Sequence, residues 1–485
     1  MVRALLLSLM ILLVGACVRN PATGHQQLNL VPESQEIQMG QQAAKEVAQS
    51  IGLYKDPKVE SYVADLGNKL KVVSDRPNVP YTFQVVDDPS VNAFALPGGP
   101  VFVTRGILAH LTSEAELATV MGHEIGHVAA RHSVNQLSKQ ELAQLGLGIG
   151  ALLSPTIGQA GQALGAGLNL LFLKFSREDE NQADELGFRY ALKSGYDVRV
   201  MKDLFILLDN VSESSQGGKL PEWLATHPNP ENRLKSTEQR LARVQLNPSA
   251  LPVNRERYLN TINGITYGEN PRQGFFKGSS FMQPELKFRL DFPPGWKTAN
   301  QPQAVAGISP SQDALVEMAL SDDPSPQNVA QKFLSAQGVQ AGDASRTEIN
   351  GLPAITSHFQ AETQQGTVQG LAAFIGYGGK TYALLGYTVP QKLGEYEPVF
   401  RQTIGSFKQL TDPEALNAQP ARLEIIKAPQ SMSLSHFNSQ FPSSISLDEL
   451  ALINGIDKNA RLRAGDTVKR VVGGVRKTAL AQSSR

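Results

Sequence analysis

Met-Gly-His-Glu-Ile-Gly-His at positions 121–127 is the stretch that decides how this chain folds and what it can do. It contains the pattern H-E-x-x-H, and the capping-box spacing of Ser113 and Glu116 predicts that a helix begins just before it. Residues four apart leave the same face of a helix, so the imidazoles of His123 and His127 can bind one metal ion. Glu124 is placed to take a proton from a water molecule at that ion.

The alternative is a pair of ordinary helix-surface histidines beside a solvated glutamate. A chance match to the motif is expected about once in a hundred chains of this composition and length. Zinc is therefore the favoured partner of these histidines. A zinc site of this kind needs a third protein ligand from elsewhere in the chain.

The composition is that of a globular protein with more than one domain. The chain has 485 residues, which is enough for two or three hydrophobic cores. Lys and Arg together number 45, as do Asp and Glu, so no net charge favours nucleic acid as a partner. The single cysteine, Cys17, excludes an internal disulfide.

The N-terminus has the pattern of an export signal. Arg3 precedes an apolar run at 4–14 that is too short to span a bilayer. Val-Gly-Ala-Cys at 14–17 resembles the lipobox of bacterial lipoproteins, in which the cysteine is lipidated and becomes the first mature residue. We therefore expect residues 1–17 to be a lipoprotein signal, Cys17 to be lipidated and 18–33 to be a tether. An ordinary signal peptide with a chance cysteine is the alternative.

Helices and strands are predicted on both sides of the motif. Helices are expected at 34–51 and 57–73, and a strand at 81–86. Beyond the motif, 142–173 is apolar and rich in Gly and Ala, and its two arms are too short to span a membrane. We expect a helical hairpin that serves as a satellite core, with a lid over the active site as the alternative.

The run at 92–104 is a candidate substrate-binding element. Turn-forming Pro97 and Gly98 interrupt it, which predicts a hairpin with one edge strand near the metal helix. An exposed edge strand can pair with an extended peptide. The edge residues are Asn92, Ala93 and Phe94. A plain structural hairpin is the alternative.

An acidic run offers the missing metal ligand. Ser176 is a candidate N-cap, and the helix it begins is expected to end near Lys193. Glu180 and Asp184 lie four apart on one face, which suits one metal ligand and one carboxylate that holds a ligand imidazole. Glu178 competes as a ligand but leaves another face of the helix. Taken alone, this run is typical of a solvated helix start.

These motifs together resemble a known family of zinc metallopeptidases. The sequence is similar to the family that includes HtpX and the CAAX prenyl proteases (metallopeptidase family forty-eight), and within it to the lipid-anchored BepA and LoiP branch. The resemblance covers about residues 30–245. It rests on His123-Glu124-x-x-His127, Glu180-x-x-Ala183-Asp184, Thr226-His227-Pro228 with Arg233, and the segment at 92–99.

The resemblance implies a role for each matching residue. His123, His127 and Glu180 would bind one Zn²⁺ per chain, and Glu124 would be the general base. Asp184 would support a ligand histidine. His227 would stabilise the oxyanion or occupy the fourth metal position in a resting state, and Arg233 would belong to the same pocket. A buried structural role is the alternative for His227, and His132 and His110 are expected to be ordinary polar residues.

The residue pattern changes beyond position 246. Residues 247–277 are rich in Pro and Asn and are expected to be a linker. Short alternating strands with two helical stretches at 278–410 predict an antiparallel sheet with helices on one face. The Phe-Pro-Pro-Gly-Trp turn at 292–296 resembles the PsbP-type α/β fold. This segment is expected to bind partners or substrates, or to act as a spacer between its neighbouring segments.

The segment 421–472 predicts a small module with the order strand, helix, helix, strand. The run at 450–455 with a late Gly465 resembles LysM modules, which bind peptidoglycan. The sequence departs from that pattern at 430–434, so glycan binding and protein contacts both stay open. The basic tail at 473–485 is expected to be disordered.

The sequence therefore predicts a multi-domain protein. A mainly α, zincin-like metallopeptidase domain with a small β-sheet is expected at 34–246, followed by the α+β PsbP-like domain and the LysM-like βααβ module. The predicted function is a zinc metalloendopeptidase of the bacterial cell envelope, lipid-anchored on the periplasmic side. Because Val18 follows the cysteine, the anchor is expected in the outer membrane if the organism has one. The predicted substrates are misfolded or misassembled envelope proteins. The alternatives are an envelope chaperone or binding scaffold, and a zinc peptidase that acts on peptidoglycan.

Overall fold

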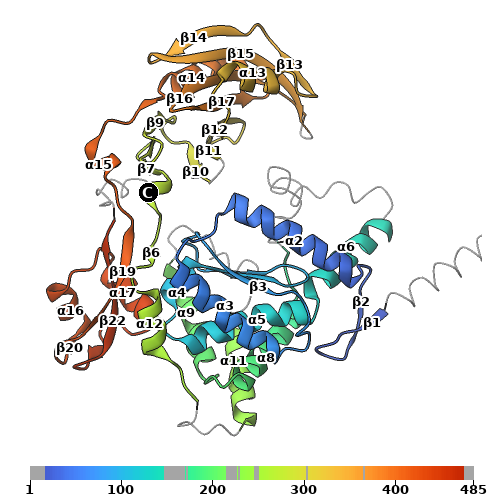
Figure 1. The fold of residues 1–485 in the computed structure, drawn as a ribbon, viewed down its shortest axis with the longest axis vertical. Coiled ribbons are helices and arrows are strands. Elements are labelled where there is room, and N and C mark those ends of the chain that lie inside the picture. The colour runs from blue at the N-terminus through green and yellow to red at the C-terminus, as the bar shows by residue number, and fades with distance from the viewer. Residues whose placement is uncertain are drawn as a thin grey trace, which may run out of the picture. The chain divides into compact units, whose positions relative to one another are not determined.

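The computed structural model describes residues 17–146, 170, 173–214, 227, 230–244, 251–301, 304–363 and 366–474. They belong to two compact units (Figure 1). Unit 1 combines Met1–Gly268 with Ala421–Val472, and unit 2 combines Glu269–Pro420 with Gly473–Arg485. The predicted signal at 1–16, most of the predicted hairpin at 142–173 and the tail from 475 lie outside the described residues.

Unit 1 is mainly helical with small sheets, as predicted. Its helices are α2 (Glu33–Ser50), α3 (Pro57–Val72), α4 (Arg105–His110), α5 (Glu114–Ala129), α6 (His132–Gly146), α8 (Arg177–Lys193), α9 (Val200–Ser214), α11 (Pro230–Arg243), α12 (Arg255–Ile262), α16 (Leu434–Gln440) and α17 (Leu447–Asn454). Its strands are β1 (Cys17–Arg19), β2 (Gln26–Leu28), β3 (Thr82–Val86), β4 (Ala93–Ala95), β5 (Pro100–Thr104), β6 (Thr266–Tyr267), β19 (Ala421–Lys427), β20 (Met432–Ser433), β21 (Arg461–Leu462) and β22 (Thr467–Gly473). Among the helices that the structure describes, none is long and apolar enough to cross a membrane.

Helix α5, which carries the H-E-x-x-H motif, is the centre of unit 1. The predicted cap is present, because the Ser113 hydroxyl accepts a hydrogen bond from the Glu116 amide at 3.2 Å. All 16 residues of α5 are buried. A helix surrounded in this way needs apolar or small residues on every face, and its charged side chains need partners.

The predicted sheet beside α5 is confirmed. Strand β3 pairs with β5 in parallel, and β4 pairs with β5 antiparallel, with Phe94 opposite Phe102. The order is β3-β5-β4, so β4 lies at an edge of this sheet. The buried Thr104 hydroxyl donates to the Asn92 carbonyl at 2.8 Å and holds the start of the edge strand.

The segment at 18–33 is packed against unit 1, so the prediction of a free tether is wrong for it. Strands β1 and β2 form an antiparallel pair in which Cys17 lies opposite Leu28. Asn20 is buried, and its amide donates to the Ala130 carbonyl at 2.9 Å. This hydrogen bond satisfies a carbonyl at the C-terminal end of α5, where the helix itself supplies no partner.

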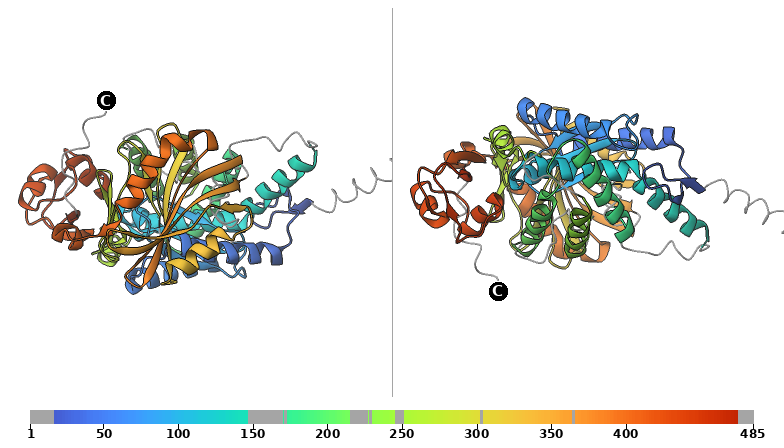
Figure 2. Two further views of the ribbon diagram at one scale, coloured as in Figure 1. Left: turned by 90° about the horizontal axis from the view of Figure 1, so that it is seen from above. Right: turned by 90° about the horizontal axis from the view of Figure 1, so that it is seen from below.

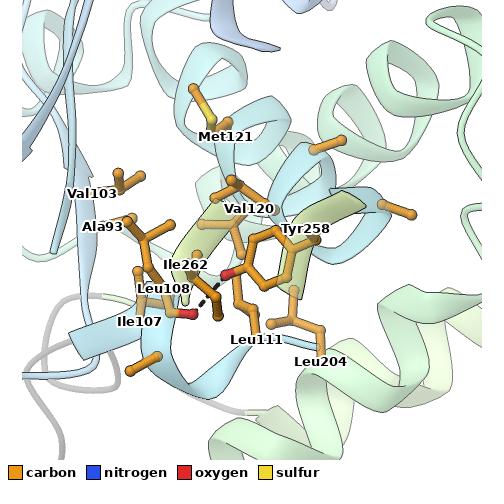
Figure 3. Packing of buried hydrophobic residues seen from close by; sticks show 14 of the residues in the cluster. Ala93, Val103, Ile107, Leu108, Leu111, Val120, Met121, Leu204, Tyr258 and Ile262 are labelled. Carbon is orange, nitrogen blue, oxygen red and sulfur yellow. Dashed lines mark hydrogen bonds between the residues drawn. The ribbon is translucent and has the colours of Figure 1, made fainter. Parts of the chain in front are cut away.

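Much of the predicted linker at 247–277 is also part of the core. Helix α12 places Tyr258 and Ile262 in one buried cluster with Val120 of α5 (Figure 3). The Tyr258 hydroxyl donates to the Leu108 carbonyl at 2.6 Å. A segment that buries these side chains cannot act as a free linker, because exposing them would cost roughly 1.5–3 kcal/mol each.

The C-terminal segment is built into unit 1. Lys469 of β22 is fully buried and donates hydrogen bonds to the carbonyls of Ala109, His110 and Leu111 at 2.9, 3.0 and 2.8 Å. These carbonyls end α4, immediately before the cap of α5. An ammonium group has three donors, and here all three are used at the negative end of a helix dipole.

The predicted order of strand, helix, helix and strand is present in this segment. Helices α16 and α17 lie between β20 and β21, which pair antiparallel with Met432 opposite Leu462. Helix α17 begins at a Ser446 cap and ends at Gly455, which has a left-handed φ of 64°. The likeness to LysM modules stays a prediction.

Unit 2 is an α+β unit. Its helices are η3 (Pro271–Gln273), α13 (Pro326–Leu334), η4 (Pro390–Lys392), α14 (Leu393–Gly405) and α15 (Pro413–Leu416). Its strands are β7 (Phe275–Lys277), β8 (Ser280–Gln283), β9 (Phe288–Asp291), β10 (Lys297–Asn300), β11 (Ala304–Ile308), β12 (Ala314–Ser321), β13 (Val339–Ala341), β14 (Ser345–Ile349), β15 (Leu352–Thr363), β16 (Gly366–Tyr377), β17 (Lys380–Thr388) and β18 (Lys408–Gln409).

The large sheet of unit 2 is antiparallel, as predicted, but its helices do not share one face. The strand order is β10-β11-β12-β17-β16-β15-β13, with β14 also paired to β15. Helices α14 and α13 lie on opposite faces of this sheet (Figure 2). Helix α14 packs Phe400 against the face that carries Leu384, and α13 packs Phe333 against the face that carries Phe374. Both faces of β16 and β17 carry apolar side chains, because each strand has a helix on either side.

We predict that replacing Lys469 by Met destabilises unit 1. The substitution keeps an unbranched side chain of similar length but leaves the three carbonyls at the end of α4 without their donors, which should lower the free energy of unfolding by about 2–4 kcal/mol. Urea denaturation of the full chain measures this loss. Lys458→Met is the matched control, because Lys458 is 58% exposed in a pair with Asp448 and should change stability by less than about 0.5 kcal/mol. Equal stability of the two variants would contradict the anchoring role of Lys469.

Candidate metal centre

Helices α5 and α8 approach closely enough to place their polar side chains in one buried site. At Gly187 of α8, an added Cβ would lie 2.7 Å from the His123 nitrogen, and at Gly122 of α5 it would lie 3.0 Å from the Gly187 carbonyl oxygen. A side chain at Gly187 would clash with the backbone of α5, and one at Gly122 would be tightly crowded, so the two backbones lie in close contact. Helix α8 begins at the predicted Ser176 cap, which forms a complete capping box with Asp179.

Four buried side chains converge between these helices. One ligand atom from each of His123, His127, Glu180 and His227 lies within 4.8 Å of the others. The Nε2 atoms of His123 and His127 are 3.0 Å apart, and His227 Nδ1 lies 3.3 Å from His123 Nε2 and 2.8 Å from Glu180 Oε1. Glu180 Oε1 lies 3.6 Å from His127 Nε2. The structure thus brings together residues that lie up to 104 positions apart in sequence.

The donor set fits a zinc ion. Bonds of about 2.0–2.2 Å in a tetrahedron place neighbouring donor atoms roughly 3.3–3.6 Å apart, close to the spacing of these atoms. Glu180 Oε2 is buried and accepts no hydrogen bond from any described residue. Its nearest cation among the described residues is Arg233 Nη1 at 3.3 Å, and a bound metal ion would stabilise a buried carboxylate oxygen that lacks a hydrogen-bond donor still further. Imidazole nitrogen and carboxylate oxygen are ligands that zinc takes readily.

Asp184 and Arg233 lie on the other side of His123. His123 Nδ1 donates to Asp184 Oδ1 at 3.0 Å, which leaves Nε2 to face the cluster. Arg233 donates to Asp184 through Nε at 2.8 Å and Nη2 at 2.6 Å, and its Nη1 lies 3.3 Å from Glu180 Oε2. Arg233 therefore contacts both carboxylates of α8 from a buried position.

Burial and the surrounding charges keep the candidate ligands of the cluster in metal-binding forms. Burial, assisted by the nearby Arg233 cation, lowers the pKa of His123 to about 4 and also lowers that of His127. Burial alone would raise the pKa of Asp184, but its pair with Arg233 lowers it well below its usual range. Burial likewise opposes ionisation of Glu180, yet His227 and Arg233 lower its pKa. Neutral imidazoles and ionised carboxylates are the forms that bind a cation.

Glu124 lies where the cluster meets the edge strand. Burial raises its pKa to about 7, and a hydrogen bond with the backbone of Ala95 in β4 acts in the opposite direction. Its Oε1 atom lies 3.8 Å from His227 Nε2. Burial would lower the pKa of His227, but the adjacent Glu180 carboxylate raises it. Glu124 thus has a pKa near neutrality beside the ligand cluster, which suits a group that exchanges protons.

The edge residues predicted to bind substrate lie beside this site but differ in exposure. Asn92 and Ala93 are buried, and Phe94 is half-buried with its ring 5.1 Å from that of Phe102. Helix α5 packs against β4. The free side of β4 is therefore a backbone edge next to Glu124 rather than a set of exposed side chains.

One residue that we expected to be ordinary contacts the site. His132 is buried, and its Nδ1 atom lies 3.0 Å from Nδ1 of His127. Helical spacing could not place it, because α5 ends at Ala129 and His132 returns through a turn in which Arg131 has a left-handed φ of 56°. His110 is distant from the cluster and bonds through Nδ1 to the Gly106 carbonyl, as expected for an ordinary polar residue.

Phe175 also borders the site and was not identified from the sequence. Its ring centroid lies 4.2 Å from that of His127 and 5.9 Å from that of His227. An aromatic ring against these imidazoles limits the access of water to the cluster.

Of the predicted motif at 226–228, only His227 is among the described residues.

A buried His-His-Glu donor set, with a glutamate directly after the first histidine, is the arrangement of the H-E-x-x-H metallopeptidases. The sequence comparisons agree with this class, because residues 57–241 match the description "Peptidase family M48". The chain belongs to peptidase family M48, which confirms the family predicted from the motifs.

Its relatives include proteins of bacteria and of mitochondria. The "Beta-barrel assembly-enhancing protease" of Yersinia pestis is 32% identical over 225 residues, which are 44% of this chain and 46% of the relative. The protein of the same name from Escherichia coli K12 is 31% identical over 248 residues, 49% of this chain and 50% of the relative. The "Mitochondrial metalloendopeptidase OMA1" of Schizosaccharomyces pombe is 31% identical over 230 residues, 47% and 67% respectively. The chain thus spans about half the length of the bacterial relatives.

A comparison with solved structures adds little to this family assignment. The cyanobacterial PsbP from Synechocystis sp. PCC 6803 covers 28% of this chain and 94% of its own, with 16% identity. Its TM-score is 0.24, which is too low to assign a fold. The PsbP-like character of unit 2 therefore stays a prediction.

We predict that Glu180→Ala abolishes stoichiometric zinc binding, because the carboxylate that faces three imidazoles is lost. Zinc content after gel filtration in zinc-free buffer, measured by atomic absorption, reports the result. Glu185→Ala is the matched control, since Glu185 is exposed on the same helix and should leave one zinc per chain. Zinc loss in Glu178→Ala with retention in Glu180→Ala would reverse the assignment.

Proposed function

We propose that this protein is a zinc-dependent metalloendopeptidase of the bacterial cell envelope. The observation that carries the proposal is the buried cluster of His123, His127 and Glu180 with Glu124 beside it. Family membership and the names of the relatives support the same activity. The proposed substrates are misfolded or misassembled envelope proteins.

Three side chains are the proposed zinc ligands, and their positions leave one place at the ion. Zinc held in this way supplies Lewis-acid chemistry and lowers the pKa of water towards neutrality. His227 Nδ1 lies among the donor atoms, 3.3 Å from His123 Nε2, so it is placed to take the fourth position in a resting state. After a movement of the ring, its N–H groups would be available to a developing oxyanion.

Glu124 is the proposed general base. A carboxyl group with a pKa of about 7 can accept a proton from the attacking water and then return it to the leaving amine. Its contact with the backbone of Ala95 holds it beside the edge strand. Arg233 is proposed to act indirectly, through the carboxylates. It pairs with Asp184 and Glu180 and so holds the proposed ligands in place.

Strand β4 is the proposed substrate-binding element. Its outer edge lies next to Glu124, so an extended peptide that adds to the sheet would pass along the site. Backbone pairing at Asn92, Ala93 and Phe94 selects extended chains rather than a particular sequence. Such selection suits unfolded or misassembled proteins as substrates.

We also propose that the protein is held on the periplasmic side of the outer membrane by a lipid on Cys17. The lipobox pattern supports the anchor, and the name of the bacterial relatives, beta-barrel assembly-enhancing protease, supports an envelope location. Unit 2 is proposed to have a PsbP-like fold and to bind substrates or partners.

Two alternative functions can be distinguished from this proposal by experiment. The order of β20, α16, α17 and β21 supports a LysM-like module and hence a peptidase that acts on peptidoglycan. A scaffold that acts as a chaperone is the other alternative. The packing of Lys469 into unit 1 favours a structural role for the same segment.

We predict that Glu124→Gln retains one zinc per chain but lowers the cleavage rate of casein by at least about 100-fold, because only the proton acceptor is lost. Zinc content and fluorescent-casein hydrolysis are measured on the same preparation. Glu185→Gln, an exposed change on α8, is the control and should retain full activity. Full activity of Glu124→Gln would refute the proposed mechanism. Cleavage of peptidoglycan but not casein by the wild-type enzyme would favour the alternative substrate.

A further inference from the structure

We propose that His132 positions the metal-binding imidazole of His127, an inference that rests on the proposed zinc site. The two Nδ1 atoms lie 3.0 Å apart, the ring centroids are 5.0 Å apart, and the rings are at 79° to one another. Both side chains are about 2% exposed. At this distance one nitrogen must donate a proton and the other must accept it.

The surroundings of His132 decide which nitrogen donates. His132 Nε2 lies 3.2 Å from Gln182 Oε1, and the Gln182 amide nitrogen donates to Glu178 Oε1 at 3.3 Å. Because Glu178 takes the amide N–H of Gln182, the Gln182 oxygen faces His132. That oxygen only accepts, so His132 Nε2 carries a proton and Nδ1 is the acceptor.

This chain of hydrogen bonds sets the tautomer of His127. Its Nδ1–H donates to His132, so its Nε2 carries a lone pair towards the cluster, 3.0 Å from His123 Nε2. His123 is held in the same tautomer by a carboxylate, Asp184. The two metal-binding histidines therefore have different supports, one charged and one neutral.

His132 reaches this position because of the turn between α5 and α6. Arg131 adopts a left-handed φ of 56°, which is unusual for a residue with a side chain. Its guanidinium donates to Glu36 Oε2 at 2.8 Å and to the Val31 carbonyl at 2.8 Å. These contacts hold the turn and direct the first residue of α6 back against His127.

His132 is not a further metal ligand. Its Nδ1 faces the outer nitrogen of His127, on the side away from the cluster formed by His123, His127, Glu180 and His227. A role limited to filling space is the remaining alternative. The two roles differ in what a substitution must preserve, which is shape for packing and an acceptor atom for positioning.

The test compares His132→Phe, which keeps the ring but has no acceptor, with His132→Asn, whose Oδ1 can replace Nδ1. Full-length apoprotein is titrated with zinc against a chromogenic chelator, and the zinc Kd is measured without reference to activity. We expect the Kd of His132→Phe to rise by about 10–100-fold, and that of His132→Asn to stay within about 10-fold of wild type. Gln182→Leu, which removes the support of His132, should give an intermediate value.

An unchanged zinc Kd in His132→Phe would overturn the proposal. Equal losses in the Phe and Asn variants would also overturn it, because a packing role would then explain both. His110→Phe is the matched control, since His110 is a half-buried histidine of unit 1 that bonds to Gly106 and is not part of the cluster. If the wild-type protein binds no zinc, the proposed function is refuted, and the proposed positioning role of His132 is refuted with it.

Discussion

The site depends on the direct contact of two helix backbones at Gly122 and Gly187. Because no side chain separates α5 from α8 there, Glu180 and Asp184 reach opposite nitrogen atoms of His123. Arg233 then forms ion pairs with both carboxylates from a buried position. A methyl group at Gly187 would meet the His123 nitrogen and force the helices apart, and the ligands would separate with them. The electrostatics of the centre thus follow from a steric constraint.

The features that the sequence predicts well are those set by neighbouring residues. The spacing of His123 and His127, the caps at Ser113 and Ser176, and the edge strand β4 all follow from local periodicity and turn chemistry. The carboxylates of α8 could be singled out only because the motif upstream needed a partner. Their approach to His123 depends on glycines whose packing role no local pattern reveals.

Prediction failed where polar or mixed segments pack over long distances. Residues 18–33 lack a strong apolar pattern, yet Asn20 completes the end of α5 through one buried hydrogen bond. The stretch at 247–277 contains Pro and Asn, which are typical of linkers, but Tyr258 and its neighbours fill a gap in the core. His132 was overlooked for a similar reason, since a left-handed turn breaks the helical spacing that relates it to His127. In each case the decisive contact joins separate elements.

The packing of Asn20 bears on where the proposed peptidase would act. Only three residues separate Cys17 from the hydrogen bond to Ala130, and a fully extended chain covers roughly 10 Å over that distance. A lipid on Cys17 would therefore hold the end of α5, and the proposed zinc ligand His127 one turn before it, at a short and nearly constant height above the bilayer. So short an anchor would confine the site to a thin zone next to the membrane. The choice of substrate would then depend on distance from the membrane. A polypeptide emerging from or stalled at the membrane passes through that zone, whereas one folded farther away does not.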